Sequence, residues 1–294
     1  LFHIMLPARG HAAAAHPTRP EAVAFARRPG TFAIVMDCAT GVEPARLLAP
    51  DGRHFYGHGA FSADGNLLLT TENDYENARG VIGLWETAGY RRIGEVPSGG
   101  VGPHEIVQTD TGFAVANGGI ETHPEAGRTK LNLPTMQPNL TYLDADARPA
   151  DQIELPPEHR LNSIRHIAYA VGRVAMGMQW QGQGPSPALV AVHDQESGLS
   201  FAPGSDASRL RGYTGSVAIS ALGDRIATTH PRGDTWLDWT IGEQSTPYSA
   251  ADVGGVAWAV GGFATTTGTG QVLTNGSVET HALNWDNHLV PLPT

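Results

Sequence analysis

A repeated pattern of short apolar strands separated by glycine turns is the feature that most constrains the fold of this 294-residue chain. Each copy begins with a Gly- or His-containing motif and continues through an apolar strand, a glycine turn, a second apolar strand, a variable loop and a third strand. The clearest copy spans residues 57–96 and contains four strand-like segments, which is the content of one propeller blade. The pattern therefore predicts an all-β chain in which helices are nearly absent.

The start motif recurs seven times, at residues 9–11, 57–59, 102–105, 164–168, 214–218, 254–258 and 286–290. We therefore predict a single domain over residues 1–294, a seven-bladed β-propeller. Residues 1–6 and 288–292 are expected to supply the outer and inner strands of the last blade, so that both chain ends close it. No sequence is left for its middle strands, so this blade is expected to be incomplete, with residues missing upstream. A pair of β-sandwiches is the main alternative.

The charge balance excludes two classes of partner. The chain has 19 Lys and Arg against 29 Asp and Glu, a net charge of −10. A surface of this sign repels nucleic acid and anionic lipid, so we expect neither as a partner. No apolar run approaches the roughly 18 residues that a membrane helix needs, so membrane insertion is not expected.

Five of the 13 histidines occupy the same position of the repeat, at the start of the innermost strand: His11, His58, His104, His166 and His288. In a propeller, the first residues of the inner strands form a ring at one mouth of the channel. Neutral imidazole is a common ligand for transition metals, and a ring without thiolates favours a borderline ion. We predict a site for iron or copper, with zinc as a further option. Alternatively, each histidine caps its strand or bonds to a neighbouring blade.

Loops between the second and third strands of each blade are expected at the same mouth, and they are rich in functional groups. Two carboxylates near the ring, Glu72 and Glu105, would complete a metal shell or orient a ligating imidazole. The arginines Arg165 and Arg232 would instead bind a carboxylate. Salt bridges between blades are the simpler interpretation. The full set of predicted ligand-binding residues is Glu72, Glu105, Asn117, His123, Arg165, His230 and Arg232.

Several motifs together resemble a known family: FARRPG at residues 25–30, FYGHG at 55–59, GPHE at 102–105, ANGGI at 116–120, SIRH at 163–166 and WDNH at 285–288. They are similar to an uncharacterised family of mostly proteobacterial β-propellers. Its members are exported by the twin-arginine route and often encoded beside imelysin-type iron-regulated and di-haem oxidoreductase-like proteins. The resemblance implies a periplasmic protein linked to metal acquisition, with other periplasmic iron-uptake proteins as partners. It implies no reaction.

The leading functional hypothesis is a periplasmic metal-handling protein that binds iron or copper, directly or as a chelate, at the channel mouth. The first alternative is a propeller metalloenzyme, a hydrolase or oxidoreductase, that uses the same site with Glu72 or Glu105 as general base. The second alternative is an interaction scaffold whose loops bind a partner protein.

Overall fold

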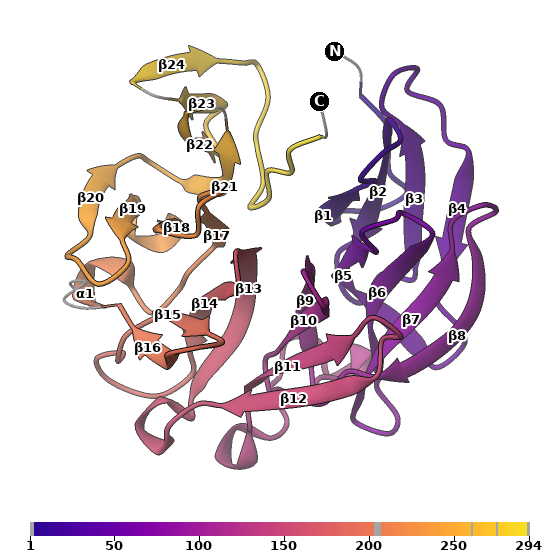
Figure 1. Ribbon diagram of the computed structural model, residues 1–294, viewed down its shortest axis with the longest axis horizontal. Helices are drawn as coiled ribbons and strands as arrows, with labels where there is room; N and C mark the ends of the chain where they lie inside the picture. The colour runs from indigo at the N-terminus through magenta and orange to yellow at the C-terminus, as the bar shows by residue number, and fades with distance from the viewer. Residues whose placement is uncertain (1–2, 203–206, 260, 275, 293–294) are drawn as a thin grey trace. The chain divides into compact units, whose positions relative to one another are not determined.

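The computed structural model describes residues 3–202, 207–259, 261–274 and 276–292. In these residues, 24 strands form six four-stranded antiparallel sheets, each built from four strands that are consecutive in the chain. The chain divides into two compact units, one of Leu1–Glu154 with Leu292–Thr294 and one of Leu155–Pro291. Each unit contains three of the sheets (Figure 1).

The sheets of the first unit are β1–β4, β5–β8 and β9–β12. Their strands are β1 (Gly10–Ala15), β2 (Glu21–Ala26), β3 (Phe32–Asp37), β4 (Ala45–Leu48), β5 (Arg53–Phe61), β6 (Leu67–Asp74), β7 (Arg79–Glu86), β8 (Arg91–Pro97), β9 (Pro103–Thr109), β10 (Gly112–Asn117), β11 (Asn139–Asp144) and β12 (Pro149–Glu154). Two 3₁₀ turns, η1 (Pro124–Ala126) and η2 (Leu133–Thr135), lie in the long β10–β11 connection.

The sheets of the second unit are β13–β16, β17–β20 and β21–β24. Their strands are β13 (Asn162–Ala170), β14 (Arg173–Trp180), β15 (Val190–Asp194), β16 (Gly198–Phe201), β17 (Ser216–Ile219), β18 (Arg225–His230), β19 (Thr235–Thr240), β20 (Thr246–Ser249), β21 (Val253–Ala259), β22 (Gly262–Thr267), β23 (Gln271–Thr274) and β24 (Ser277–Thr280). The helical elements are η3 (Pro157–His159), η4 (Pro231–Gly233) and α1 (Ala207–Leu210), the one α-helix among the described residues. Among all the residues that the structure describes, no helix is long and apolar enough to cross a membrane.

Burial falls from the first two strands of a sheet to the last. The second strand β6, with the sequence LLLTTEND, is buried over seven of its eight residues, whereas β12 and β20 are almost wholly exposed. The cores lie between the faces of neighbouring sheets. Between the first two sheets, Phe25, Phe55 and Trp85 pack together and are at most 4% exposed. Burying such a side chain contributes about 1.5–3 kcal/mol, so this packing between sheets stabilises the unit.

The prediction of seven blades was wrong, because the described residues form six. The start motif at residues 286–290 resembles the others but is followed by Pro291, which has no N–H for a strand ladder. Residues 281–292 form no strand, and neither do residues 3–6 of the expected outer strand. Leu1, Phe2, Pro293 and Thr294 lie outside the described residues. The sixth sheet, β21–β24, already has its four strands without them.

Candidate metal centre

Three predicted histidines of the first unit lie where the first strand of a sheet bulges. The register of β1 against β2 shifts across His11, and that of β5 against β6 shifts across His58. The β9–β10 register shifts across His104, because Glu105 pairs with Ala116 and Pro103 with the next residue, Asn117. A bulge leaves a residue outside the ladder and redirects its side chain. The local backbone irregularity therefore turns three imidazoles away from the regular strand direction.

The rings of His11, His58 and His104 lie at the corners of a nearly equilateral triangle. Their centroids are 4.9 Å apart for His11 and His58, 4.9 Å for His58 and His104, and 5.4 Å for His11 and His104. One potential ligand nitrogen from each ring lies within 4.8 Å of the other two. His58 is buried, and the other two are half-buried. The three predicted ring histidines that fall in this unit therefore lie close together.

A carboxylate lies against the buried member of the triangle. Oε1 of Glu105 is 3.3 Å from Nδ1 of His58, and the Glu105 side chain is only 18% exposed. Metal-binding histidines commonly use one ring nitrogen for the ion and the other for a carboxylate or carbonyl, which fixes the tautomer and the ring orientation. Of the two predicted carboxylates, Glu105 has this position.

Two further residues that the sequence interpretation missed fix the triangle. The backbone of Gly57 on β5 has a φ of +111°, and a Cβ there would lie 2.5 Å from Cδ2 of His11 on β1. Only glycine therefore leaves room for the His11 side chain next to β5. The hydroxyl of Thr71 on β6 donates to the carbonyl oxygen of His58 at 3.1 Å and lies 3.4 Å from the carbonyl oxygen of His104. The GHG motif contained a signal for Gly57. No sequence signal marked Thr71, because its role depends on two other strands.

The other two ring histidines lie in the second unit and are close to each other. His166 follows the register shift of β13 and is buried, and His288 lies in the segment after β24. Their ring centroids are 5.0 Å apart, with an interplanar angle of 56°. Arg165 lies between Ile164 and His166, where the register shifts. Its Nη2 lies 3.4 Å from Oε1 of Gln179.

Two predicted ligand-binding residues of the first unit belong to structural networks. Glu72 is fully buried and accepts hydrogen bonds from Arg92 at 2.5 and 3.0 Å and from the hydroxyl of Thr70 at 2.8 Å. Asn117 is fully buried as well, and its amide group bonds to Ser98 and Asn139. Glu72 thus bonds within its own sheet, and Asn117 bonds to β11 of its own sheet and to the connection before β9.

The remaining predicted residues lie apart from the triangle or in the other unit. His123 caps η1 by accepting from the N–H of Glu125, and its Nε2 lies 3.5 Å from Glu76. His230 is fully buried, with its ring nitrogens 3.0 Å from the carbonyl of Tyr213 and the hydroxyl of Thr228. Burial lowers the pKa of His230 to about 4, so the ring is neutral at pH 7. The guanidinium of Arg232 lies 4.8 Å from the ring centroid of Tyr213.

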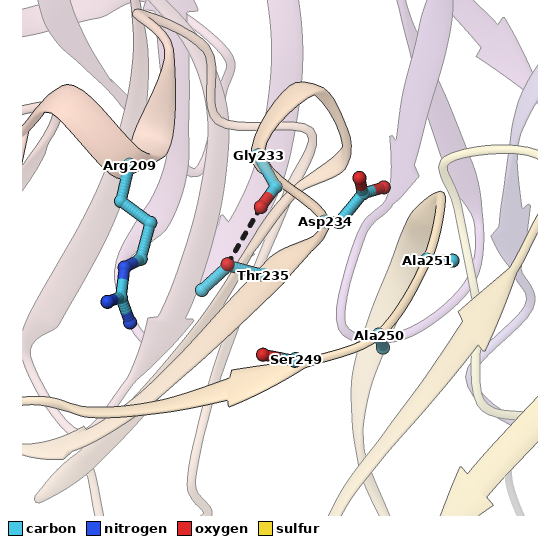
Figure 2. Close-up of a pocket in the computed structure, with 7 residues that line it drawn as sticks. All are labelled: Arg209, Gly233, Asp234, Thr235, Ser249, Ala250 and Ala251. Atoms are coloured by element: carbon cyan, nitrogen blue, oxygen red, sulfur yellow. Dashed lines mark hydrogen bonds between the residues drawn. The ribbon is translucent and has the colours of Figure 1, made fainter.

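A hollow of about 410 Å³ lies beside η4 and β20 in the second unit, lined by Arg209, Gly233, Asp234, Thr235, Ser249, Ala250 and Ala251. Figure 2 shows the Thr235 hydroxyl donating to the carbonyl of Gly233, at 2.8 Å. The Asp234 carboxylate accepts from the N–H of Asp252. The lining contains no histidine or cysteine, so this hollow lacks the ligands that a transition metal prefers.

Comparison with solved structures establishes the fold. The chain is similar to the crystal structure of the Cps50 (Swd1) β-propeller domain from Myceliophteria thermophila, with 12% sequence identity and a TM-score of 0.58. The match covers 91% of this chain and 82% of that chain. At this identity the likeness concerns the fold alone, which together with the six sheets is an all-β propeller of six blades.

No curated protein matches the chain. The sequence model of a family described as "Protein of unknown function (DUF1513)" matches residues 4–292, nearly the whole chain. That span includes the bulged histidines, Glu105 and the segment after β24. The protein therefore belongs to the DUF1513 family.

Proposed function

We propose that this protein binds a transition metal ion through the imidazoles of His11, His58 and His104. The observation that carries the proposal is the triangle of rings with ligand nitrogens within 4.8 Å of one another. Three nitrogens around one zinc ion at 2.0–2.1 Å are about 3.3 Å apart, so modest rotation of the side chains would close the set.

The donor set favours a borderline ion. Imidazole suits zinc, copper, iron and nickel, whereas calcium and magnesium prefer oxygen ligands. Iron or copper is our first choice, because the resemblance described above links related propellers to iron-regulated proteins. Metal handling in the periplasm, as a free ion or a chelate and alongside other iron-uptake proteins, is the cellular role that we propose.

Glu105 would act from outside the triangle. Its carboxylate, 3.3 Å from Nδ1 of His58, would hold the proton on that nitrogen and leave Nε2 for the ion. Three imidazoles also fill only part of a four- or six-coordinate shell. The remaining positions would take water, a chelating ligand or other side chains.

A metalloenzyme is the second candidate function, and the position of Glu105 favours it. A carboxylate next to a three-histidine set could serve as general base toward a metal-bound water, which such a set activates in zinc enzymes. Turnover of lactone, ester or redox-dye substrates by the metal-loaded protein, lost in Glu105→Gln, would support the enzyme. Stoichiometric binding without turnover supports metal handling.

The decisive experiment is metal analysis of protein purified without chelator, followed by titration of the apo protein with Zn²⁺, Cu²⁺ and Fe²⁺ in a calorimeter. We expect His58→Ala to weaken binding by at least about 100-fold, more than loss of an orienting partner would. The matched control is His123→Ala, which removes a histidine that caps η1 outside the triangle. Absence of binding, or equal binding by His58→Ala and the wild-type chain, would leave the interaction scaffold as the better hypothesis.

A further inference from the structure

We propose that His166 and His288 form a two-imidazole binding site for a divalent transition metal ion, and that the ion fastens the segment after β24 to strand β13. The segment comprises residues 281–291 of the second unit and is called the C-terminal strap below. The inference rests on residues of this unit alone and does not require the three-histidine site.

The C-terminal strap has a seat made by two glycines. Gly254 and Gly255 occupy the register shift of β21 against β22. A Cβ on Gly255 would lie 2.8 Å from Oγ1 of Thr266 on β22, and on the strap 2.9 Å from the backbone nitrogen of Leu289 and 3.0 Å from the carbonyl carbon of His288. A Cβ on Gly254 would lie 3.1 Å from the carbonyl oxygen of Asp286. Glycine is therefore required at the bulge for the strap backbone to approach β21 this closely.

Two hydrogen bonds hold the strap, one at its start and one within the part that packs on the two glycines. At its start, the N–H of His281 donates to the carbonyl of Gly270, 2.9 Å away. Within the part that packs on the glycines, the side-chain amide of Asn287 donates to the hydroxyl of Tyr213, 3.0 Å away. No strand ladder joins the strap to the sheet, because residues 281–292 contain no strand. Its attachment thus depends on a few polar contacts and on close packing at the bulge.

When the strap is packed on Gly254 and Gly255, His288 lies next to His166. The ring centroids are 5.0 Å apart and the rings are inclined by 56°, so two ring nitrogens can approach one ion from different directions. The two residues come from elements far apart in sequence, β13 and the strap. An ion that bonds to both imidazoles therefore closes a long loop, and its binding free energy stabilises the seated strap against the open one.

Amide hydrogen exchange of the full chain, with and without NiCl₂, tests the proposal. When Ni²⁺ is present at 100 times its Kd, exchange of strap amides should slow by up to about 100-fold. Neither His166→Ala nor His288→Ala should show this protection. His281→Ala, which removes a histidine of the strap outside the pair, should retain it.

A second variant pair tests the seat independently of the metal. Gly255→Ala should speed strap exchange without Ni²⁺ and weaken the protection by Ni²⁺, because the added methyl group collides with the strap backbone. Gly94→Ala is the matched control, since a Cβ there meets nothing closer than 3.9 Å. The inference is overturned if the wild-type chain binds Ni²⁺ without any change in strap exchange, or if His288→Ala keeps the protection. Loss of binding in His58→Ala concerns the three-histidine site instead.

Discussion

The hydroxyl of Thr71 donates a hydrogen bond to the carbonyl oxygen of His58, 3.1 Å away across the bulge of β5. The same hydroxyl lies 3.4 Å from the carbonyl oxygen of His104 on the neighbouring sheet. One fully buried side chain thus ties together the backbones of two histidines of the triangle. We therefore expect the spacing between their rings to depend on this link.

Replacing Thr71 with Val should therefore lower metal affinity by about tenfold, within the range seen when a group that orients a ligand is removed. Stability should fall by about 1 kcal/mol, as for a lost buried hydrogen bond. Thr71→Ser keeps the hydroxyl and should restore the affinity. Thr87→Val is the control, because Thr87 donates a comparable buried bond to the carbonyl of Gly65 away from the triangle. Calorimetric titration and urea unfolding measure the two effects.

Glu105→Gln should weaken metal binding by about 10- to 100-fold while changing stability little, since Gln is a poorer acceptor for the His58 N–H. The matched control is Glu76→Gln, which alters an exposed glutamate 3.5 Å from His123, outside the triangle. A two-dimensional ¹H–¹⁵N spectrum of the apo protein reports the His58 tautomer directly. Unchanged affinity in Glu105→Gln, or an Nε2-protonated His58 in the wild-type chain, would contradict the orienting role.

Gly57→Ala should displace His11 and reduce metal affinity, because the new methyl group would lie 2.5 Å from the imidazole. It should also destabilise the protein by about 1–3 kcal/mol through its positive φ. Gly52→Ala separates the two effects: its φ is +75°, but a Cβ there meets nothing within 4 Å. Its stability loss should come without a change in metal affinity. Equal affinities for the two variants would mean that the position of His11 does not matter.

The repeat could be predicted because its signals are local. Apolar runs and glycine turns, such as those around Gly65 and Gly223, determine strands and hairpins from neighbouring residues. The positions of His11, His58 and His104 in the inner strands followed from that alignment. The number of blades did not, because the motif at residues 286–290 resembles a blade start while its backbone packs across Gly255.

The contacts between strands could not be predicted. A bulge is a property of two paired strands, so the redirection of His104 depends on its partner β10 and is absent from the local sequence. Glu72 was expected in a loop, but β6 extends to Asp74 and places Glu72 opposite Phe55 in the ladder. Its ion-pair partner, Arg92, lies two strands away.

Glu72→Ala should destabilise the protein by about 1.5–3 kcal/mol, because Arg92 loses its hydrogen bonds to a fully buried carboxylate but keeps its ion pair with Glu95. Metal content should not change, because the carboxylate oxygens of Glu72 accept hydrogen bonds from Arg92 within the second sheet. The double variant Glu72→Met, Arg92→Leu should recover much of the stability, as replacement of a buried pair by apolar groups often does. Urea unfolding and metal analysis of each variant test this assignment. Loss of metal from a folded Glu72→Ala protein would contradict it.

His230 should make the protein sensitive to acid. Its pKa is about 4 in the folded chain because of burial and about 6.5 in the unfolded chain, so the unfolded state binds more protons between these values. The stabilisation is complete above about pH 6.5 and is lost as the pH falls toward 4. The loss should reach about 2 kcal/mol at pH 5 and about 3 kcal/mol below pH 4.

His230→Gln tests this sensitivity, because glutamine does not titrate yet retains groups for the Tyr213 carbonyl and the Thr228 hydroxyl. The variant should be less stable than the wild-type chain at pH 7, where a well-fitted ring is lost. The difference should shrink as the pH falls, since the variant lacks the cost of protonating a buried imidazole. His16, His54 and His159 also have lowered pKa values, chiefly from burial, so a residual acid sensitivity of the same sign should remain. Urea unfolding of both proteins at several values from about pH 7 to about pH 4.5 measures the difference. Parallel curves for the two proteins would show that His230 is not the titrating group.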